Sequence, residues 1–227
     1  MNEITYNKFI KNNPQLIQDY GKKCKKHVVQ NCDEYIDVNQ ILYHGTSKEN
    51  AQSILNNGFI IDRYNGTQTQ GIGVYSAFDE NTARTFGKDI LILDTTFAKL
   101  LNMAGRAYQE FNGLKSEFIK KIKSAFGTQK NEYFTPEEWE QKIEGKIDST
   151  CEILARMRGI PVQEKAEDTL LTQEASIILA NIFDEEVTKQ KGKSAILSQT
   201  RGVFMEPIEQ LVIRDLGEIK SVKELDI

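Results

Sequence analysis

A histidine and a tyrosine about thirty residues apart each stand beside glycine, in stretches that suit the binding of a polar ligand. His44 lies in ILYHGT at residues 41–46, and Tyr75 lies in GIGVYSA at residues 71–77. Glycine lets backbone approach a ligand closely where a side chain would block it. An imidazole can donate or accept a hydrogen bond, and an aromatic ring can stack on a cation. Each stretch is therefore a candidate part of a ligand-binding site.

The elements around His44 are predicted to hold it at a strand end. The apolar run 41–43 is typical of a strand that carries His44, Gly45 and Thr46 at its end, and a helix is expected to begin directly after these residues. Thr46 and Glu49 have the spacing of a capping box, and Gly58 is placed to end this helix. His44 is therefore expected to face whatever lies above the sheet.

The elements around Tyr75 follow a similar order. A polar loop containing Arg63 precedes it, and after it Asp79 is expected to cap a short helix that ends at Gly87. The apolar run 90–93, bounded by acidic residues, is then typical of a buried strand. Tyr75 is expected to lie at the mouth of the glycine-flanked turn.

These positions together resemble the NAD-binding core of ADP-ribosyltransferases of the diphtheria toxin and poly(ADP-ribose) polymerase type. That family carries Tyr-His-Gly-Thr in its first motif, here residues 43–46, and a Gly-x-Tyr-Ser-like second motif, here residues 73–76. It also carries an aromatic residue eleven positions after the motif tyrosine, here Phe86. A single short motif would be weak evidence, but several positions at fixed spacing are specific.

The resemblance implies NAD as co-substrate, with no metal. Cleaving the bond between nicotinamide and ribose generates an oxocarbenium-like centre, as in glycoside hydrolysis. By similarity, His44 would hydrogen-bond a ribose hydroxyl, Gly45 would offer its backbone to the nicotinamide amide, and Tyr75 and Phe86 would enclose the nicotinamide ring. The expected NAD-binding residues are Gly45, Thr46, Arg63, Gly73, Ser76 and Phe86. Thr46 is equally expected to serve only as a helix cap, and Arg63 either contacts the pyrophosphate or is an ordinary surface arginine.

The third family motif departs from its usual pattern. The family opens a strand near the end of its core with a catalytic glutamate and ends it with an aspartate. If that aspartate is Asp215, Gln210 stands at the glutamate position. Glutamine can hydrogen-bond but cannot act as a base at neutral pH. If the alignment with the family strand is shifted by one residue, Glu209 stands at the glutamate position instead. Only one of the two can face NAD, since neighbouring strand residues face opposite ways. Glu206 is a further alternative.

The expected fold is of the α+β class, with a split, mixed or antiparallel sheet. Residues 1–40 are predicted to form a helical segment that packs on the core and borders the NAD cleft. Residues 41–96 and 192–227 are predicted to form the ADP-ribosyltransferase core, with strands at 195–197, 202–205 and 211–213. Residues 97–191, predicted helical from Thr95 onward, form an insertion too long for an ordinary connection. This insertion either recognises the target or covers a sheet face.

Composition narrows the setting. The 227-residue chain has a formal charge of −4, so it lacks a global attraction to nucleic acid or anionic membranes. Its amino terminus has no stretch typical of a signal peptide, and no apolar run is long enough to span a bilayer. Three cysteines without a CxxC pair indicate reduced thiols. We expect a cytoplasmic protein, or one injected into the cytoplasm of a target cell.

The predicted function is transfer of single ADP-ribose units from NAD to a protein or nucleic acid, as in a bacterial toxin, antiviral factor or effector. A toxic protein of this kind would need a neutralising antitoxin protein. One alternative is an inactive module that binds NAD or ADP-ribose, because Gln210 lacks the family's charge. The other is an NAD glycohydrolase that uses water as acceptor.

Overall fold

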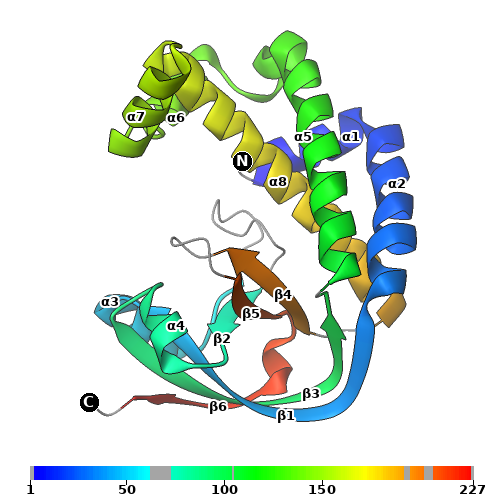
Figure 1. The fold of residues 1–227 in the computed structure, drawn as a ribbon, viewed down its shortest axis with the longest axis vertical. Coiled ribbons are helices and arrows are strands. Elements are labelled where there is room, and N and C mark those ends of the chain that lie inside the picture. Colours follow the sequence, from blue (N-terminus) through cyan, green and yellow to red (C-terminus); the bar gives the residue numbers. More distant parts are fainter. Residues whose placement is uncertain (1–2, 62–72, 104, 192–194, 202–206, 226–227) are drawn as a thin grey trace.

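The computed structural model describes residues 3–61, 73–103, 105–191, 195–201 and 207–225. Within these ranges the chain is of the α+β class, as predicted, with one six-stranded, mostly antiparallel sheet and a separate group of helices (Figure 1). The strands are β1 (Asp33–Thr46), β2 (Val74–Ala77), β3 (Asp89–Asn102), β4 (Ala195–Arg201), β5 (Pro207–Ile213) and β6 (Ile219–Glu224). The helices are α1 (Glu3–Asn12), α2 (Pro14–Lys23), α3 (Lys48–Asn57), α4 (Glu80–Arg84), α5 (Arg106–Tyr133), α6 (Pro136–Glu144), α7 (Ser149–Arg158) and α8 (Val162–Lys191).

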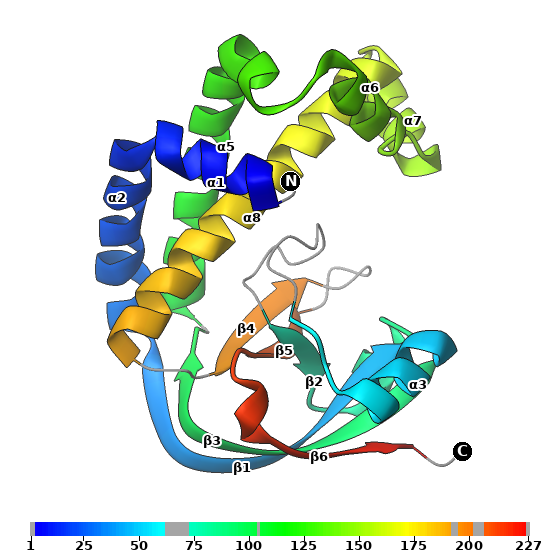
Figure 2. The same cartoon turned by 180° about the vertical axis from the view of Figure 1, so that it is seen from behind.

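The strand order is β1-β2-β5-β4-β3-β6, with a further pairing between β1 and β3. Only β3 and β4 are parallel among the described pairs. The β1–β3 pairing is the longest and runs from Asp33↔Asn102 to Thr46↔Asp89. Both long strands bend, so that one end lies beneath α3 and α4 and the other reaches the helices (Figures 1 and 2). The sheet therefore joins the two halves of the molecule.

Two boundaries differ from the sequence prediction. Strand β1 begins at Asp33, inside the segment expected to be helical, and β3 continues to Asn102, although a helix was expected from Thr95. Phe97, Leu100 and Leu101 have helical spacing because the strand crosses between two cores. Phe97 and Leu100 pack in the sheet core, whereas Leu101 packs in the helical core. Pairing with β1 outweighed the local pattern.

The helical core includes the N-terminal helices together with α5, α6 and α8. The ring centroids of Tyr20 on α2 and Phe118 on α5 are 4.7 Å apart, and those of Phe9 on α1 and Tyr133 on α5 are 5.6 Å apart. Between α2 and β1 lie a π-helical turn (Cys24–Val28) and a 3-10 turn (Val29–Asn31). The N-terminal segment thus packs mainly on the predicted insertion, not on the sheet core.

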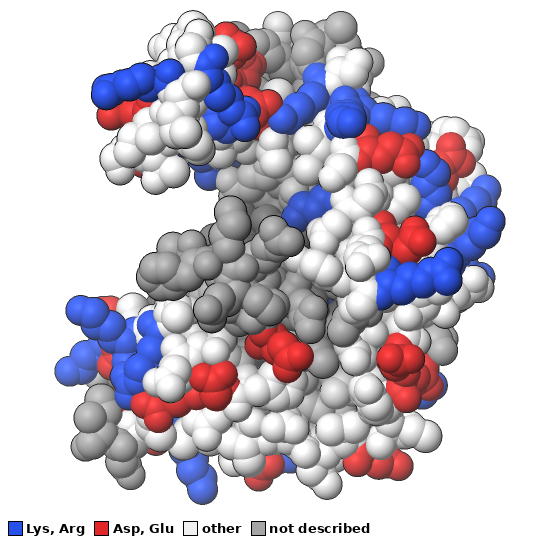
Figure 3. Space-filling model, viewed as in Figure 1, with Lys and Arg blue, Asp and Glu red and all other residues white. Residues whose placement is uncertain are grey.

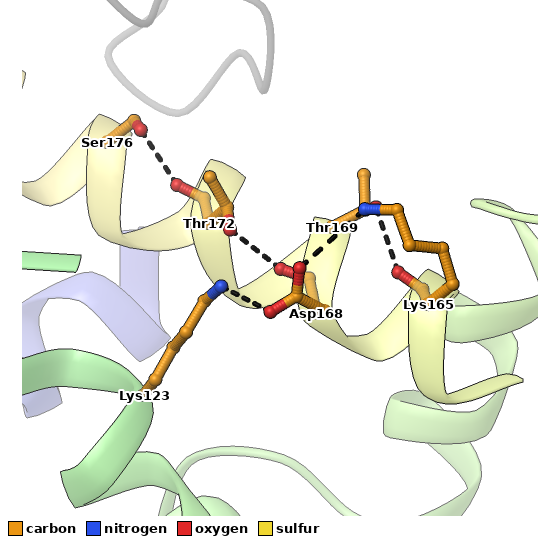
Figure 4. Close-up of polar contacts among 6 residues, drawn as sticks. All are labelled: Lys123, Lys165, Asp168, Thr169, Thr172 and Ser176. Carbon is orange, nitrogen blue, oxygen red and sulfur yellow. Dashed lines mark hydrogen bonds and ion pairs between the residues drawn. The ribbon is translucent and has the colours of Figure 1, made fainter. Parts of the chain in front are cut away.

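Polar contacts lie both within α8 and between α8 and its neighbours. Lys123 of α5 and Lys165 of α8 both approach the carboxylate of Asp168, and hydroxyls of Thr169, Thr172 and Ser176 bond to carbonyls one turn earlier (Figure 4). Further along, Asp184 of α8 pairs with Arg214 just beyond β5, with the Nε–Oδ1 distance at 2.6 Å. This second pair joins the helical group to the sheet.

Capping explains where several helices begin. Thr135 and Glu138 form both hydrogen bonds of a capping box at the start of α6, at the predicted helix start. Asp148 caps α7 through the N–H of Cys151. None of the helices in the described part of the chain has the length and apolar character needed to cross a lipid bilayer.

Candidate functional site

A pocket of about 640 Å³ lies beside the place where β1 and β2 meet. Among the described residues, the pairing between these strands is limited to Tyr43↔Ala77. The predicted residues that line this pocket are His44, Gly45, Thr46, Gly73, Tyr75, Ser76, Phe86 and Gln210. Residues from both sequence motifs therefore contribute to one cavity, whose size is ordinary for a small-molecule site.

The imidazole of His44 is held by the opposite motif. Its Nδ1 atom lies 2.8 Å from the carbonyl oxygen of Tyr75. A carbonyl can only accept, so Nδ1 carries the hydrogen and Nε2 of the neutral ring is an acceptor. Burial lowers the pKa of His44 from its ordinary value, although the bond to Tyr75 acts in the opposite direction. The imidazole of His44 also makes an edge-on contact with the ring of Phe59, with the ring centroids 5.2 Å apart.

Two of the aromatic residues that line the pocket, Tyr75 and Phe86, come from different elements. Tyr75 lies on β2 and is partly exposed, and Phe86 follows α4 with 53% of its surface exposed. An aromatic ring this exposed beside a cavity can gain contact area when a flat ligand binds. Both residues line the same pocket.

Gln210 and Glu209 have opposite environments on β5. Gln210 pairs with Ala77 of β2, is 5% exposed and lines the pocket. Glu209 is exposed and is not among the described residues that line it. Alternation along the strand explains this difference. The pocket therefore receives a neutral amide from β5.

The motif glycines bring backbone segments together. A Cβ atom at Gly45 would lie 1.9 Å from the carbonyl oxygen of Ala83 in α4, and one at Gly87 would lie 2.2 Å from the backbone nitrogen of Thr46. A Cβ at Gly73 would lie 2.4 Å from the carbonyl oxygen of Ile213. The sequence predicted that such glycines allow a ligand to approach the backbone. In the structure, the backbone of another element of the same chain packs against each of them. These contacts set Phe86, between Ala83 and Gly87, against the end of β1.

The start of α3 differs from the prediction. Ser47 is the N-cap, and its Oγ accepts a hydrogen bond from the N–H of Asn50 at 3.3 Å. Thr46 is instead the last residue of β1 and is 8% exposed, so the prediction that it caps the helix is wrong. The cap, and with it the start of α3, lies one residue later than expected. Gly58 ends the helix with a φ of 79°, as predicted.

The cap of α4 agrees with its prediction. Asp79 accepts hydrogen bonds from the backbone N–H and the hydroxyl of Thr82, at 2.8 and 2.7 Å. These bonds hold the pKa of the Asp79 carboxyl below its ordinary value. The cap fixes the entry to the turn that carries Phe86.

Some pocket residues were not predicted. Asn50, Ser53 and Ile54 reach the pocket from α3, and Phe59 and Ile60 follow that helix. The sequence signal for these residues was their helical spacing, since positions three and four apart share one face.

Ser76 was predicted as a binding residue, and its Oγ is buried without a hydrogen-bond partner. Arg63 and Glu206 lie outside the described residues.

The cysteines take no part in the pocket. Cys24, Cys32 and Cys151 are free thiols, and Cys24 and Cys151 are buried. Among the described residues, no group of three or more His, Cys, Asp or Glu side chains is arranged to hold a metal ion.

Comparison of the chain with protein-family models, with curated proteins and with solved structures found no match. The chemistry of the pocket is therefore inferred from its own residues.

Proposed function

We propose that this protein cleaves NAD between nicotinamide and ribose and transfers the ADP-ribose to a macromolecular acceptor. The observation that carries the proposal is the convergence of His44, Tyr75, Phe86 and Gln210 on one pocket from separate elements. Each alone has an ordinary structural explanation. Their joint placement, at the spacing that resembles the ADP-ribosyltransferase motifs, supports a common ligand.

In this proposal the nicotinamide ring enters between Tyr75 and Phe86. Stacking of a cationic ring on an aromatic face stabilises it by roughly 0.5 to 2 kcal/mol. The backbone of Gly45 binds the nicotinamide amide, and Nε2 of His44 accepts a hydrogen bond from a ribose hydroxyl. The ring is cationic in NAD and neutral in free nicotinamide. The cation–π part of the stacking therefore stabilises bound NAD and not the released nicotinamide.

Gln210 defines the limits of this chemistry. Its amide oxygen can accept a hydrogen bond from a ribose hydroxyl and present a dipole to the developing positive charge. It cannot remove a proton from an acceptor, which must therefore arrive as a good nucleophile or bring its own base. The proposal is accordingly transfer of single ADP-ribose units, not growth of a chain.

The same residue favours a second candidate, a module that binds NAD or ADP-ribose without cleaving it. A neutral amide where the family has a carboxylate removes charge stabilisation from the transition state while leaving hydrogen bonding intact. A hydrolase that uses water is the third candidate. If the transferase proves toxic to its own cell, we propose a neutralising partner protein.

Labelled NAD distinguishes the three candidates. The wild type is incubated with NAD in cell extract, and nicotinamide release and transfer of label to protein or nucleic acid are measured. Binding of NAD to the purified protein is measured separately. Tyr75→Ala and Gln210→Ala are expected to lose at least about tenfold in release, because each removes pocket contacts. Glu209→Ala, on the exposed face of the same strand, is the matched control and is expected to retain activity.

The outcomes are separable. Release with transferred label supports the transferase, release without label supports the hydrolase, and binding without release supports the module. Gln210→Glu adds a further test, since a carboxylate at this position is expected to increase nicotinamide release. Loss of activity in Glu209→Ala with retention in Gln210→Ala would contradict the proposed site.

A further inference from the structure

A second cavity, of about 530 Å³, lies in the helical half of the molecule. It is formed by Asn131 near the end of α5, by α6, by the turn after α6 and by the beginning of α8, and none of its described lining residues belongs to the NAD pocket. Its apolar surface comes from Pro136, Trp139, Ile143, Ile147 and Pro161. Trp139 is 6% exposed and its Nε1 donates to Glu167 at 3.1 Å, so the indole is fixed in place. We call this cavity the α6–α8 groove.

The charges of the α6–α8 groove are all of one sign. Glu140 and Glu144 come from α6, and Glu164 and Glu167 come from α8. The described residues that line the groove include no lysine or arginine. Glu140 and Glu144 are four residues apart on one helix, an arrangement that destabilises the helix by a few tenths of a kcal/mol. Helix stability therefore does not explain why the carboxylates are gathered here.

The neighbouring helix adds exposed apolar surface. Ile147 lines the groove with 37% of its surface exposed and lies just before α7. On α7, Ile153, Leu154 and Met157 are 57%, 37% and 78% exposed. Figures 1 and 2 show α6 and α7 side by side at the end of the molecule away from β6. Exposed apolar side chains grouped in this way are typical of a protein-binding surface.

We propose that the α6–α8 groove docks a basic segment of a partner protein, with an apolar side chain seated against Trp139 and flanking lysines or arginines opposite the four glutamates. Two features of the groove select this occupant. The apolar floor requires an apolar anchor, and the acidic rim requires positive charge beside it. A nucleic acid is disfavoured because its phosphates would meet carboxylates.

The charges elsewhere are arranged differently. Figure 3 shows lysine and arginine side chains mixed with aspartate and glutamate over the α7 end, over the α3–α4 end and over the side of the molecule formed by α2 and α5. The acidic α6–α8 groove is therefore a local feature and does not follow from the overall charge of −4. The inference concerns a surface separate from the NAD pocket, and its test does not depend on NAD.

Trp139 is the only tryptophan in the chain, so its fluorescence reports on the groove directly. The full-length protein is titrated with a 14-residue amphipathic peptide of leucine and lysine. We expect a saturable change in emission that weakens as salt is raised from 50 to 300 mM, because the rim charges are screened. A leucine–glutamate peptide of the same pattern and an oligolysine without leucine are expected to bind at least about tenfold more weakly.

Two double variants locate the interaction. Glu140→Gln with Glu144→Gln is expected to weaken peptide binding about tenfold. Glu137→Gln with Glu152→Gln removes the same charge from exposed positions of α6 and α7 outside the groove, and is expected to change binding less than twofold. Circular dichroism checks that both variants are folded.

Several results would overturn the inference. They are an absence of saturable change with the leucine–lysine peptide, equal weakening in both double variants, and equal binding of the leucine–glutamate peptide or of oligolysine. A single-stranded RNA that changes Trp139 emission at lower concentration than the peptide would also overturn it, by showing the wrong class of partner.

Discussion

Nδ1 of His44 and the carbonyl oxygen of Tyr75 lie 2.8 Å apart, so the imidazole of the first motif is oriented by the backbone of the second. The two motifs are thus coupled through a bond that needs neither a ligand nor the phenol ring. The bond fixes which nitrogen carries the hydrogen and leaves Nε2 as the acceptor of the neutral ring. Any change that separates β1 from β2 would release the imidazole as well.

The pH dependence of His44 follows from its burial. Burial lowers the pKa of this group, so the neutral ring persists below the ordinary value of 6.5 and is protonated only at more acidic pH. NMR titration of the imidazole resonances is expected to give a midpoint below 6.5 for His44. The chain has two histidines, and His44→Asn identifies which signal belongs to which residue. A midpoint at or above 6.5 would contradict the described environment.

Gly45 and Gly113 offer a paired test of the close approach between β1 and α4. Alanine at Gly45 would place Cβ 1.9 Å from the Ala83 carbonyl oxygen, whereas nothing lies within 4 Å of the corresponding position at Gly113 in α5. Gly45→Ala is expected to lower the free energy of unfolding by about 3 kcal/mol through overpacking. Gly113→Ala is expected to raise it by up to about 1 kcal/mol, because alanine favours a helix interior. Urea unfolding measures the free energy of unfolding of both variants. A similar change in the two variants would contradict the close approach of Gly45 to Ala83.

The sequence was informative where local chemistry determines local structure. Asp79, Thr135 and Gly58 each begin or end a helix at the predicted place, because caps depend on nearby residues. The motif histidine and tyrosine were expected around one site, and both line the same pocket. Their role in binding NAD stays a prediction.

The predictions from sequence were wrong or incomplete where contacts between residues far apart in the chain determine the structure. Residues 33–40 and 95–102 form strands because they pair with each other, and neither segment has a clear strand pattern of its own. Thr46 was mistaken for a cap because the capping-box spacing ignores how far the preceding strand extends. Asn50 and Ser53 were missed because their position in the pocket depends on how α3 lies against the sheet.

Glu218 is predicted to make stability fall as pH rises. Its side chain is buried in the 3-10 turn Leu216–Glu218, and burial, with a smaller effect of Asp215, raises its pKa to about 8. The unfolded chain releases this proton near the ordinary value of 4.5, so the folded state holds more protons between about pH 4.5 and 8. Over that window the group lowers the free energy of unfolding by up to about 1.4 kcal/mol per pH unit.

Glu218→Gln tests this expectation because it keeps the shape and removes the titration. Unfolding by urea at a series of pH values is expected to show a flatter profile for the variant and a higher stability than wild type at pH 8. Parallel profiles for the two proteins would show that Glu218 does not titrate in this window.

The buried pair of Asp184 and Arg214 is predicted to hold β5, the strand that carries Gln210, against α8. Their side chains are 8% and 6% exposed, so removing one partner leaves a charge in a poorly solvated site. Asp184→Asn is expected to cost about 3–5 kcal/mol in the free energy of unfolding, and Asp184→Leu combined with Arg214→Met distinctly less, since no charge is then stranded. Lys99→Met, which breaks the exposed pair with Glu34, is expected to cost less than about 1 kcal/mol. Urea unfolding compares the three, and a double variant as unstable as Asp184→Asn would show that the pair itself, not the stranded charge, provides the stabilisation.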